Sequence, residues 1–117
     1  MRIAESERTV MTPLWENGSM LAKDLAAELK KKVGWSKTTT YTMIKRCMDK
    51  GYISRDTDVF LCTATLTKAQ VADMETDALL ENNYDGSADL LVAALVDKKK
   101  LTTEQLGKLY RILKEAE

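Results

Sequence analysis

The sequence of 117 residues contains no histidine, and this absence removes much of enzyme chemistry. Histidine is the commonest general base, the usual activator of a nucleophilic serine or cysteine, and the commonest zinc ligand. The chain also has no glycine-rich phosphate loop and no clustered metal ligands. We therefore expect neither catalysis nor a metal or organic cofactor.

Cysteine and proline are scarce as well. Cys47 and Cys62 are the only cysteines and lie too far apart in the sequence for a metal knuckle. In a reducing compartment a disulfide between them is not expected. We interpret both as small apolar core residues, with a redox-sensing role as the alternative. The single proline, Pro13, falls within a helical pattern, where it bends the helix or shifts its start.

Long hydrophobic runs are also missing. The longest, residues 90–96, is far shorter than the roughly 20 residues that span a membrane. The first residues lack the apolar stretch of a signal peptide. With 44% hydrophobic and 31% charged residues, the composition is that of a globular protein. We expect a folded cytoplasmic protein without a membrane partner.

Charge is balanced overall but not along the chain. Lys and Arg number 18, as do Asp and Glu, yet residues 1–66 carry a net charge of +3 and residues 67–117 a net charge of −3. Between residues 30 and 55 there are eight basic side chains and one acidic one, Asp49, a local net charge of +7. Such a segment either meets an anionic partner or forms a solvated helix face.

Apolar residues at helical spacing predict three helices in the first 50 residues. We expect them at 6–17 with Ser6 as N-cap, at 21–32, and at 39–50 after an N-cap at Ser36. Residues 52–55 and 59–63 predict a short β-hairpin. Three helices followed by a hairpin are typical of a winged helix-turn-helix.

The predicted third helix has two different faces. One face is formed by Thr40, Met43, Ile44, Cys47 and Met48 and is expected to be buried. The other carries hydroxyl and amino groups that suit phosphate oxygens and base edges in the DNA major groove. The residues predicted to face DNA on this basis are Ser36, Lys37, Thr38, Tyr41, Thr42 and Lys45.

The charges that flank this helix are less decisive. Lys30, Lys31 and Lys32 either meet the phosphate backbone or form a solvated helix end. At the hairpin tip, Asp56-Thr57-Asp58 would repel a phosphate, so the wing either stays away from DNA or reaches it through Arg55 alone.

From residue 67 the chain is acidic and helical. Thr67 to Gln70 and Thr102 to Gln105 have the form of capping boxes, and Asp85-Gly86-Ser87 predicts a turn and cap. The segment 88–96 is apolar on every side, which two short neighbouring helices cannot cover, so we expect a homodimer. The predicted interface residues are Leu90, Leu91, Val92, Leu95, Val96, Leu106, Leu109, Tyr110 and Leu113.

The first half of the chain also carries a fairly specific set of motifs. Ser6-Glu7, Val10-Met11 and Leu14-Trp15 are followed by residues 34–39 (GWSKTT), Lys45-Arg46 and residues 50–53 (KGYI). With these motifs the chain resembles the penicillinase repressor (BlaI/MecI/CopY) family of bacterial transcriptional regulators. The resemblance implies a homodimeric repressor whose third helix lies in the major groove of a near-palindromic DNA operator. It adds Thr39 and Arg46 to the expected DNA contacts, and Tyr41 stands where members often have a basic residue.

Two departures bear on regulation. In the penicillinase and methicillin-resistance repressors an Asn-Phe bond in the dimerisation region is cleaved, and the aligned bond here is Ala94-Leu95. The resemblance therefore does not imply the same protease, although a regulatory protease of different preference is compatible with it. Copper-responsive members have a C-terminal cysteine cluster, which this chain lacks after Cys62.

The sequence thus predicts a mainly helical protein with a small β-hairpin wing. Residues 1–66 would form a winged-helix DNA-binding domain and residues 67–117 a helical dimerisation domain. The alternative is a protein-interaction module in which Asp56 and Asp58 of the wing dock a partner and specific DNA binding is lost. An enzyme is the weakest of the three hypotheses.

Overall fold

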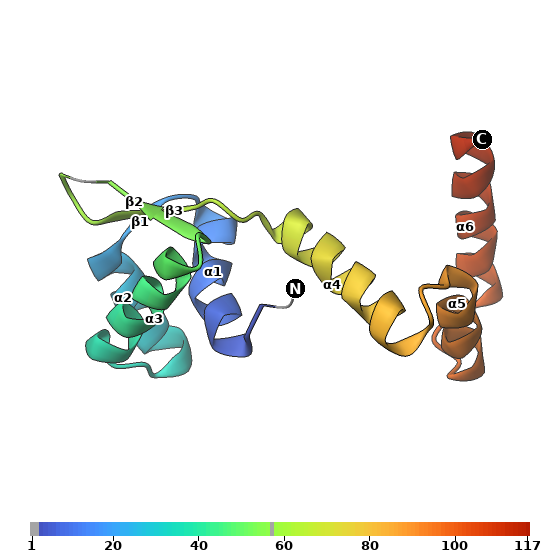
Figure 1. The fold of residues 1–117 in the computed structure, drawn as a ribbon, viewed down its shortest axis with the longest axis horizontal. Coiled ribbons are helices and arrows are strands. Elements are labelled where there is room, and N and C mark those ends of the chain that lie inside the picture. The colour runs from blue at the N-terminus through green and yellow to red at the C-terminus, as the bar shows by residue number, and fades with distance from the viewer. Residues whose placement is uncertain (1–2, 57) are drawn as a thin grey trace. The chain divides into compact units, whose positions relative to one another are not determined.

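The computed structural model describes residues 3–56 and 58–117. These are mostly helical, with one small antiparallel sheet (Figure 1), which confirms the predicted fold class. The elements in chain order are α1 (Glu5–Asn17), β1 (Met20–Leu21), α2 (Ala22–Val33), α3 (Lys37–Asp49), β2 (Ile53–Arg55), β3 (Leu61–Ala64), α4 (Lys68–Asn83), α5 (Ala88–Asp97) and α6 (Thr103–Ala116).

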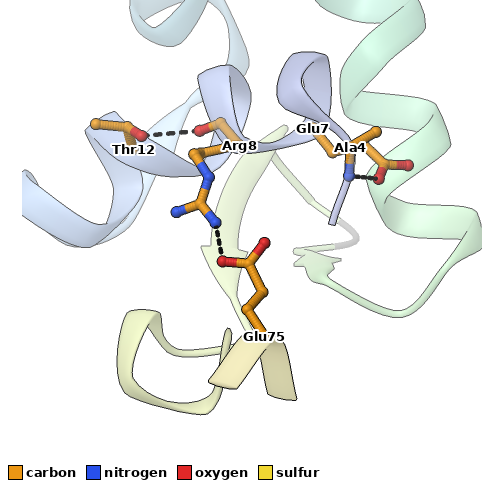
Figure 2. Close-up of polar contacts among 5 residues, drawn as sticks. All are labelled: Ala4, Glu7, Arg8, Thr12 and Glu75. Carbon is orange, nitrogen blue, oxygen red and sulfur yellow. Dashed lines mark hydrogen bonds and ion pairs between the residues drawn. The ribbon is translucent and has the colours of Figure 1, made fainter. Parts of the chain in front are cut away.

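The chain forms two compact units, Met1–Glu75 and Thr76–Glu117. The first half of α4 belongs to the first unit, where Val71 is buried in the core. An ion pair adds to this attachment, because Arg8 Nη2 of α1 lies 2.5 Å from Glu75 Oε1 of α4 (Figure 2). The predicted division into functional domains at residue 66 stays a prediction.

In the first unit, helices α1, α2 and α3 pack on one another and on the sheet. The apolar side chains that form the centre of this core include Val10, Met11, Leu25, Leu29, Ile44 and Cys62. The sheet has the strand order β1-β3-β2, with Cys62 of β3 paired to Met20 on one side and Arg55 on the other. Strand β1 was not predicted. Leu21, expected in the second helix, pairs instead with Leu61, and α2 begins at Ala22.

The first helix begins earlier than predicted. Its N-cap is Ala4, and Ser6 lies inside the helix, so the predicted cap was wrong. The physical reason is Glu7, whose Oε1 accepts a hydrogen bond of 2.9 Å from the Ala4 N–H (Figure 2). A carboxylate in the first turn also interacts favourably with the positive end of the helix dipole.

The predicted starts of the later helices agree better with the structure. Ser36 caps α3, and both capping boxes are confirmed, with reciprocal hydrogen bonds between Thr67 and Gln70 and between Thr102 and Gln105. Ser87 is the N-cap residue of α5 but makes no capping bond, because its hydroxyl donates to the Asp89 carboxylate instead.

Glu7 is the one charged side chain among the described residues that is completely buried in this unit. Its Oε2 lies 2.5 Å from Nζ of Lys50, the residue that caps the end of α3. Burial on its own raises the pKa of Glu7, but hydrogen bonds from Lys50 and Ala4 and the charges of Lys50 and Arg46 outweigh it and hold the pKa below its usual 4.5. The pair therefore links the start of α1 to the end of α3.

Both cysteines lie in the core with no exposed surface, as predicted. Burial, reinforced by the negative charge of Glu7, raises the pKa of the Cys47 thiol to about 12. Burial also raises the pKa of Cys62. A thiol held protonated in this way is a poor nucleophile, so this packing disfavours the redox alternative.

The second unit is built differently. Neither α5 nor α6 contains a buried residue, although α5 is almost entirely apolar. The large hydrophobic side chains exposed in this unit are Leu79, Leu90, Val92, Val96, Leu106, Leu109, Tyr110, Ile112 and Leu113. Within residues 3–56 and 58–117, no helix has the length and apolarity needed to span a membrane.

The buried carboxylate predicts how stability responds to acid. Because the pKa of Glu7 is lower in the folded protein than in the unfolded chain, its contribution is complete above pH 4.5 and is lost as the pH falls through the folded value. The free energy of unfolding should therefore decline in acid, and Glu7→Gln should flatten that decline. Urea denaturation across a pH series measures both. Glu5→Gln, at an exposed site on α1, is the control, and an equal acid slope in Glu7→Gln would contradict the assignment.

Thr40 offers a second test. Its side chain is fully buried in α3, and its hydroxyl has no hydrogen-bond partner among the described residues. Valine has nearly the same shape without the desolvated hydroxyl, so Thr40→Val should raise the free energy of unfolding by about 1 kcal/mol. Urea denaturation provides the measurement. Thr42→Val, on the exposed face of the same helix, should change little. A lower midpoint in Thr40→Val would show that the hydroxyl is satisfied.

Candidate nucleic-acid interface

Helix α3 is held by one face and by its two ends. Thr40, Met43, Ile44 and Cys47 are buried against the first unit. At the N-terminus, the Ser36 hydroxyl accepts a hydrogen bond of 3.1 Å from the Thr39 N–H. At the other end Gly51 has φ +79°, a conformation that residues with a Cβ adopt at a cost. These contacts leave the remaining face of α3 open to solvent.

That open face gathers five of the predicted DNA contacts. The residues that line one shallow depression on α3 are Lys37, Thr38, Tyr41, Thr42 and Lys45. All are exposed except Tyr41, which is half-buried. Lys45 makes one exposed ion pair, with Asp49 at 3.4 Å, which contributes little and leaves the ammonium accessible. The face thus presents two ammonium groups, two Thr hydroxyls and a phenol together.

Thr39 and Arg46 lie on the other flank of the helix and do not line the depression. Thr39 takes part in the N-cap, since its Oγ1 also accepts a 3.0 Å hydrogen bond from the Ser36 hydroxyl. Arg46 is exposed and close enough to Glu7 for its charge to act on that carboxylate. The predicted contacts therefore cover the open face from the depression to this flank.

The wing meets α3 through aromatic contacts. The Cζ of Arg55 on β2 lies 3.9 Å from the centroid of the Phe60 ring. The Phe60 ring in turn packs edge-on against Tyr41, with centroids 5.7 Å apart, and Lys37 Nζ lies 5.7 Å from the Tyr41 centroid. Arg55 is thereby joined to the depression. Sequence reasoning did not single out Phe60, although it is the chain's only phenylalanine.

The Asp56 carboxylate at the tip of the wing has a local structural role. The Asp56 carboxylate accepts a 2.9 Å hydrogen bond from the Asp58 N–H, which is a common way for Asp to stabilise a turn. Thr57, part of the predicted tip, lies outside the described residues. Asp56 is therefore explained by the turn itself, without a partner protein.

The three lysines at the end of α2 differ in whether their charge is paired within the protein. Lys32 pairs with Glu28 at 2.8 Å and with Glu16 at 3.9 Å, so much of its charge is balanced within the protein. Lys30 and Lys31 are exposed and make no ion pair with another described residue. Only these two retain the free charge that a phosphate contact requires.

The described residues include no group of three or more His, Cys, Asp or Glu side chains arranged to hold a metal ion. The arrangement instead offers a helix with an exposed row of donors, a wing joined to it, and positive charge around both. Such an arrangement is suited to binding an extended anion.

Comparison with known proteins agrees with this interpretation. Residues 3–115 match the family described as penicillinase repressor. The penicillinase repressor of Bacillus licheniformis is 27% identical over 116 residues, which cover 97% of this chain and 91% of that protein. The methicillin resistance regulatory protein MecI of Staphylococcus aureus strain N315 is 26% identical over 113 residues, covering 95% and 92%.

A solved structure is similar as well. It is the solution structure of the DNA-binding domain of the repressor BlaI, with a TM-score of 0.51 and 28% sequence identity, and the match covers 60% of this chain and 93% of that domain. This likeness confirms the predicted winged-helix architecture. The chain belongs to the penicillinase repressor family, a family of DNA-binding transcriptional repressors rather than enzymes.

Proposed function

We propose that this repressor acts as a homodimer, that it inserts α3 of each protomer into the major groove of a near-palindromic operator, and that it blocks a promoter by occupying it. The observation that carries the DNA-binding part is the open face of α3, where donors gather on a helix whose opposite face is buried. An α-helix fits the major groove, and such helices contact bases through residues near their N-terminus.

Charge supports the same docking. Lys37, Lys45 and Arg46 lie on the exposed surface of α3, and Arg55 lies next to it on β2. Each phosphate that such a cation neutralises releases counterions, so affinity falls with salt by a log–log slope of about −0.9 per contact. Binding that depends on several such contacts is steeply sensitive to salt.

The second unit supports the homodimer. Its helices α5 and α6 expose large apolar side chains and bury none. Removing apolar surface from water gains about 25 cal/mol per Å², so a second copy that covers these faces would supply the missing stabilisation. The two DNA-binding units of one dimer would match operator half-sites about 34–36 Å apart.

Dimer formation also offers a means of induction. Joining two DNA-binding units that each bind weakly raises the effective concentration of the second unit at its half-site. Separating the two units removes that gain in affinity. The Ala94–Leu95 bond lies inside α5, where the Ala94 and Leu95 carbonyls accept hydrogen bonds from Lys98 and Lys100. A regulatory protease that cuts there has to unwind this helix first, and the cut would divide the proposed interface.

The docking predicts the effect of Arg46→Ala. Losing this contact should weaken binding of the operator by about tenfold to a hundredfold, and Thr39→Ala should also weaken it. Fluorescence anisotropy with a labelled duplex from the region upstream of this protein's own gene, against a scrambled duplex at two salt concentrations, measures the effect.

The control for Arg46→Ala is Lys68→Ala, which removes an exposed cation from the start of α4, a helix that is not among the main packing partners of α3. It should leave affinity nearly unchanged. Fluorescence of Trp15 and Trp35, both in the first unit, checks that each variant is folded. Wild-type affinity in both Arg46→Ala and Thr39→Ala would overturn the docking.

The dimer predicts the effect of Leu109→Asp. A carboxylate placed within the apolar stripe of α6 should convert a dimer into a monomer, and operator binding should weaken with it. Lys108→Asp introduces the same side chain at the neighbouring exposed position off the stripe and should leave the dimer intact. Sedimentation equilibrium gives the mass. A Leu109→Asp variant that remains dimeric and binds DNA as tightly as the wild type would contradict the proposed interface.

A further inference from the structure

Phe60 contacts three separate elements of the first unit. Its backbone carbonyl accepts a 2.8 Å hydrogen bond from the N–H of Ala22, the first residue of α2. Its ring edge meets Tyr41 of α3 at an interplanar angle of 77°, and the Arg55 guanidinium of β2 lies over the ring. The side chain is half-buried and packs against the core. Phe60 is therefore fixed by the helices while it supports an exposed arginine.

This arrangement suits a phosphate contact. Stacking on a ring uses the flat face of the guanidinium and leaves the N–H donors at its edge free. Among the described carboxylates none forms an ion pair with Arg55, even though Asp56 follows it directly and Asp58 is close in sequence. Arg55 is thus held in one orientation, and no described carboxylate neutralises its charge.

We propose that Phe60 is a positioning residue for DNA recognition. It holds Arg55 as a preoriented contact to a DNA phosphate and, through Tyr41, fixes that contact relative to α3. This inference rests on the proposed operator binding and goes further by assigning a role to a residue that does not itself touch DNA.

The physical gain is preorganisation. A free arginine side chain has many rotamers and loses that freedom when it binds, which reduces affinity. A stacked arginine has already lost much of it in the unbound protein. Because the same ring packs against Tyr41, the wing contact and the α3 contacts have a fixed spacing, which a DNA backbone of regular geometry can match. Without the ring nothing holds the guanidinium at the position of the phosphate, so the contact itself should be lost and removing the ring should have the effect of removing Arg55.

The test is a double-mutant cycle in the full chain. The probe is the DNA duplex that the wild-type protein enriches from a random-sequence library. The variants are Phe60→Leu, Arg55→Ala and both together, with Phe60→Tyr as the conservative variant that keeps a ring. Val59→Ala removes part of an exposed neighbouring apolar side chain and serves as the matched control. Affinity is measured over a series of salt concentrations.

We expect Phe60→Leu and Arg55→Ala each to weaken binding by about fivefold and to reduce the salt slope by about 0.9, the value of one phosphate contact. The double variant should be no weaker than Arg55→Ala alone, and Phe60→Tyr and Val59→Ala should resemble the wild type. A purely structural role for Phe60 would lower the unfolding midpoint without reducing the salt slope, which would overturn the proposal. Losses that multiply in the double variant, or wild-type affinity in Phe60→Leu, would also overturn it.

Two further measurements keep the outcomes distinct. If Phe60→Leu does not fold, NMR of the free wild-type protein replaces it. The δ-methylene protons of Arg55 should then be shifted upfield by the ring, and unshifted protons would overturn the proposal. A wild-type chain that enriches no duplex would contradict the proposed operator binding itself. Because this selection is done before the Phe60 variants are measured, the two failures are distinguishable.

Discussion

The architecture of the first unit depends on a constraint on α3, which must be fixed without using the face that we propose binds DNA. A helix packed on all sides could not enter a groove, and one packed on none would not hold its direction. Here the buried face of α3 carries Thr40, Met43, Ile44 and Cys47, Ser36 caps its start, and Lys50 at its end pairs with the buried Glu7 of α1. The helices α1 and α2, the sheet and the first half of α4 serve as the support that makes this one-sided attachment stable.

The second unit has the opposite balance between polar and apolar surface. Its helices expose leucine and valine side chains that in a monomer would remain in contact with water. Their hydrogen bonds are satisfied within each helix, but short helices gain most of their stability from packing of an apolar face. In the proposed homodimer, burial of these apolar side chains stabilises the second unit and also joins two DNA-binding units. Folding of the second unit and DNA affinity of the first would then be parts of one equilibrium, so a signal that separates the protomers would lower DNA affinity without touching α3.

The sequence was most informative where a structural signal lies within a few residues. Ser36, the two capping boxes and the buried face of α3 are recognisable because the bonding partners are three or four positions apart. The sequence did not predict contacts between distant segments. These are the pairing of Leu21 with Leu61, the burial of Val71, and the packing of Phe60 on Tyr41. The exposed row of donors on α3 could thus be listed from the sequence. Its connection to the wing could not, because that connection depends on Phe60, just before β3, packing against Tyr41 of α3.

A chain with a net charge of zero has no overall attraction for a polyanion, but the distribution of charge matters more than its sum. At physiological ionic strength exposed charges separated by more than about 8 Å are largely screened from each other. The acidic surplus of residues 67–117 therefore does not cancel the basic surplus around α3 simply by belonging to the same chain. Within the first unit several acids are also engaged: Glu7 binds Lys50, Glu28 binds Lys32, and Asp56 binds the backbone of the wing. The cations that remain exposed on α3 and at Arg55 consequently determine the field that an approaching phosphate meets.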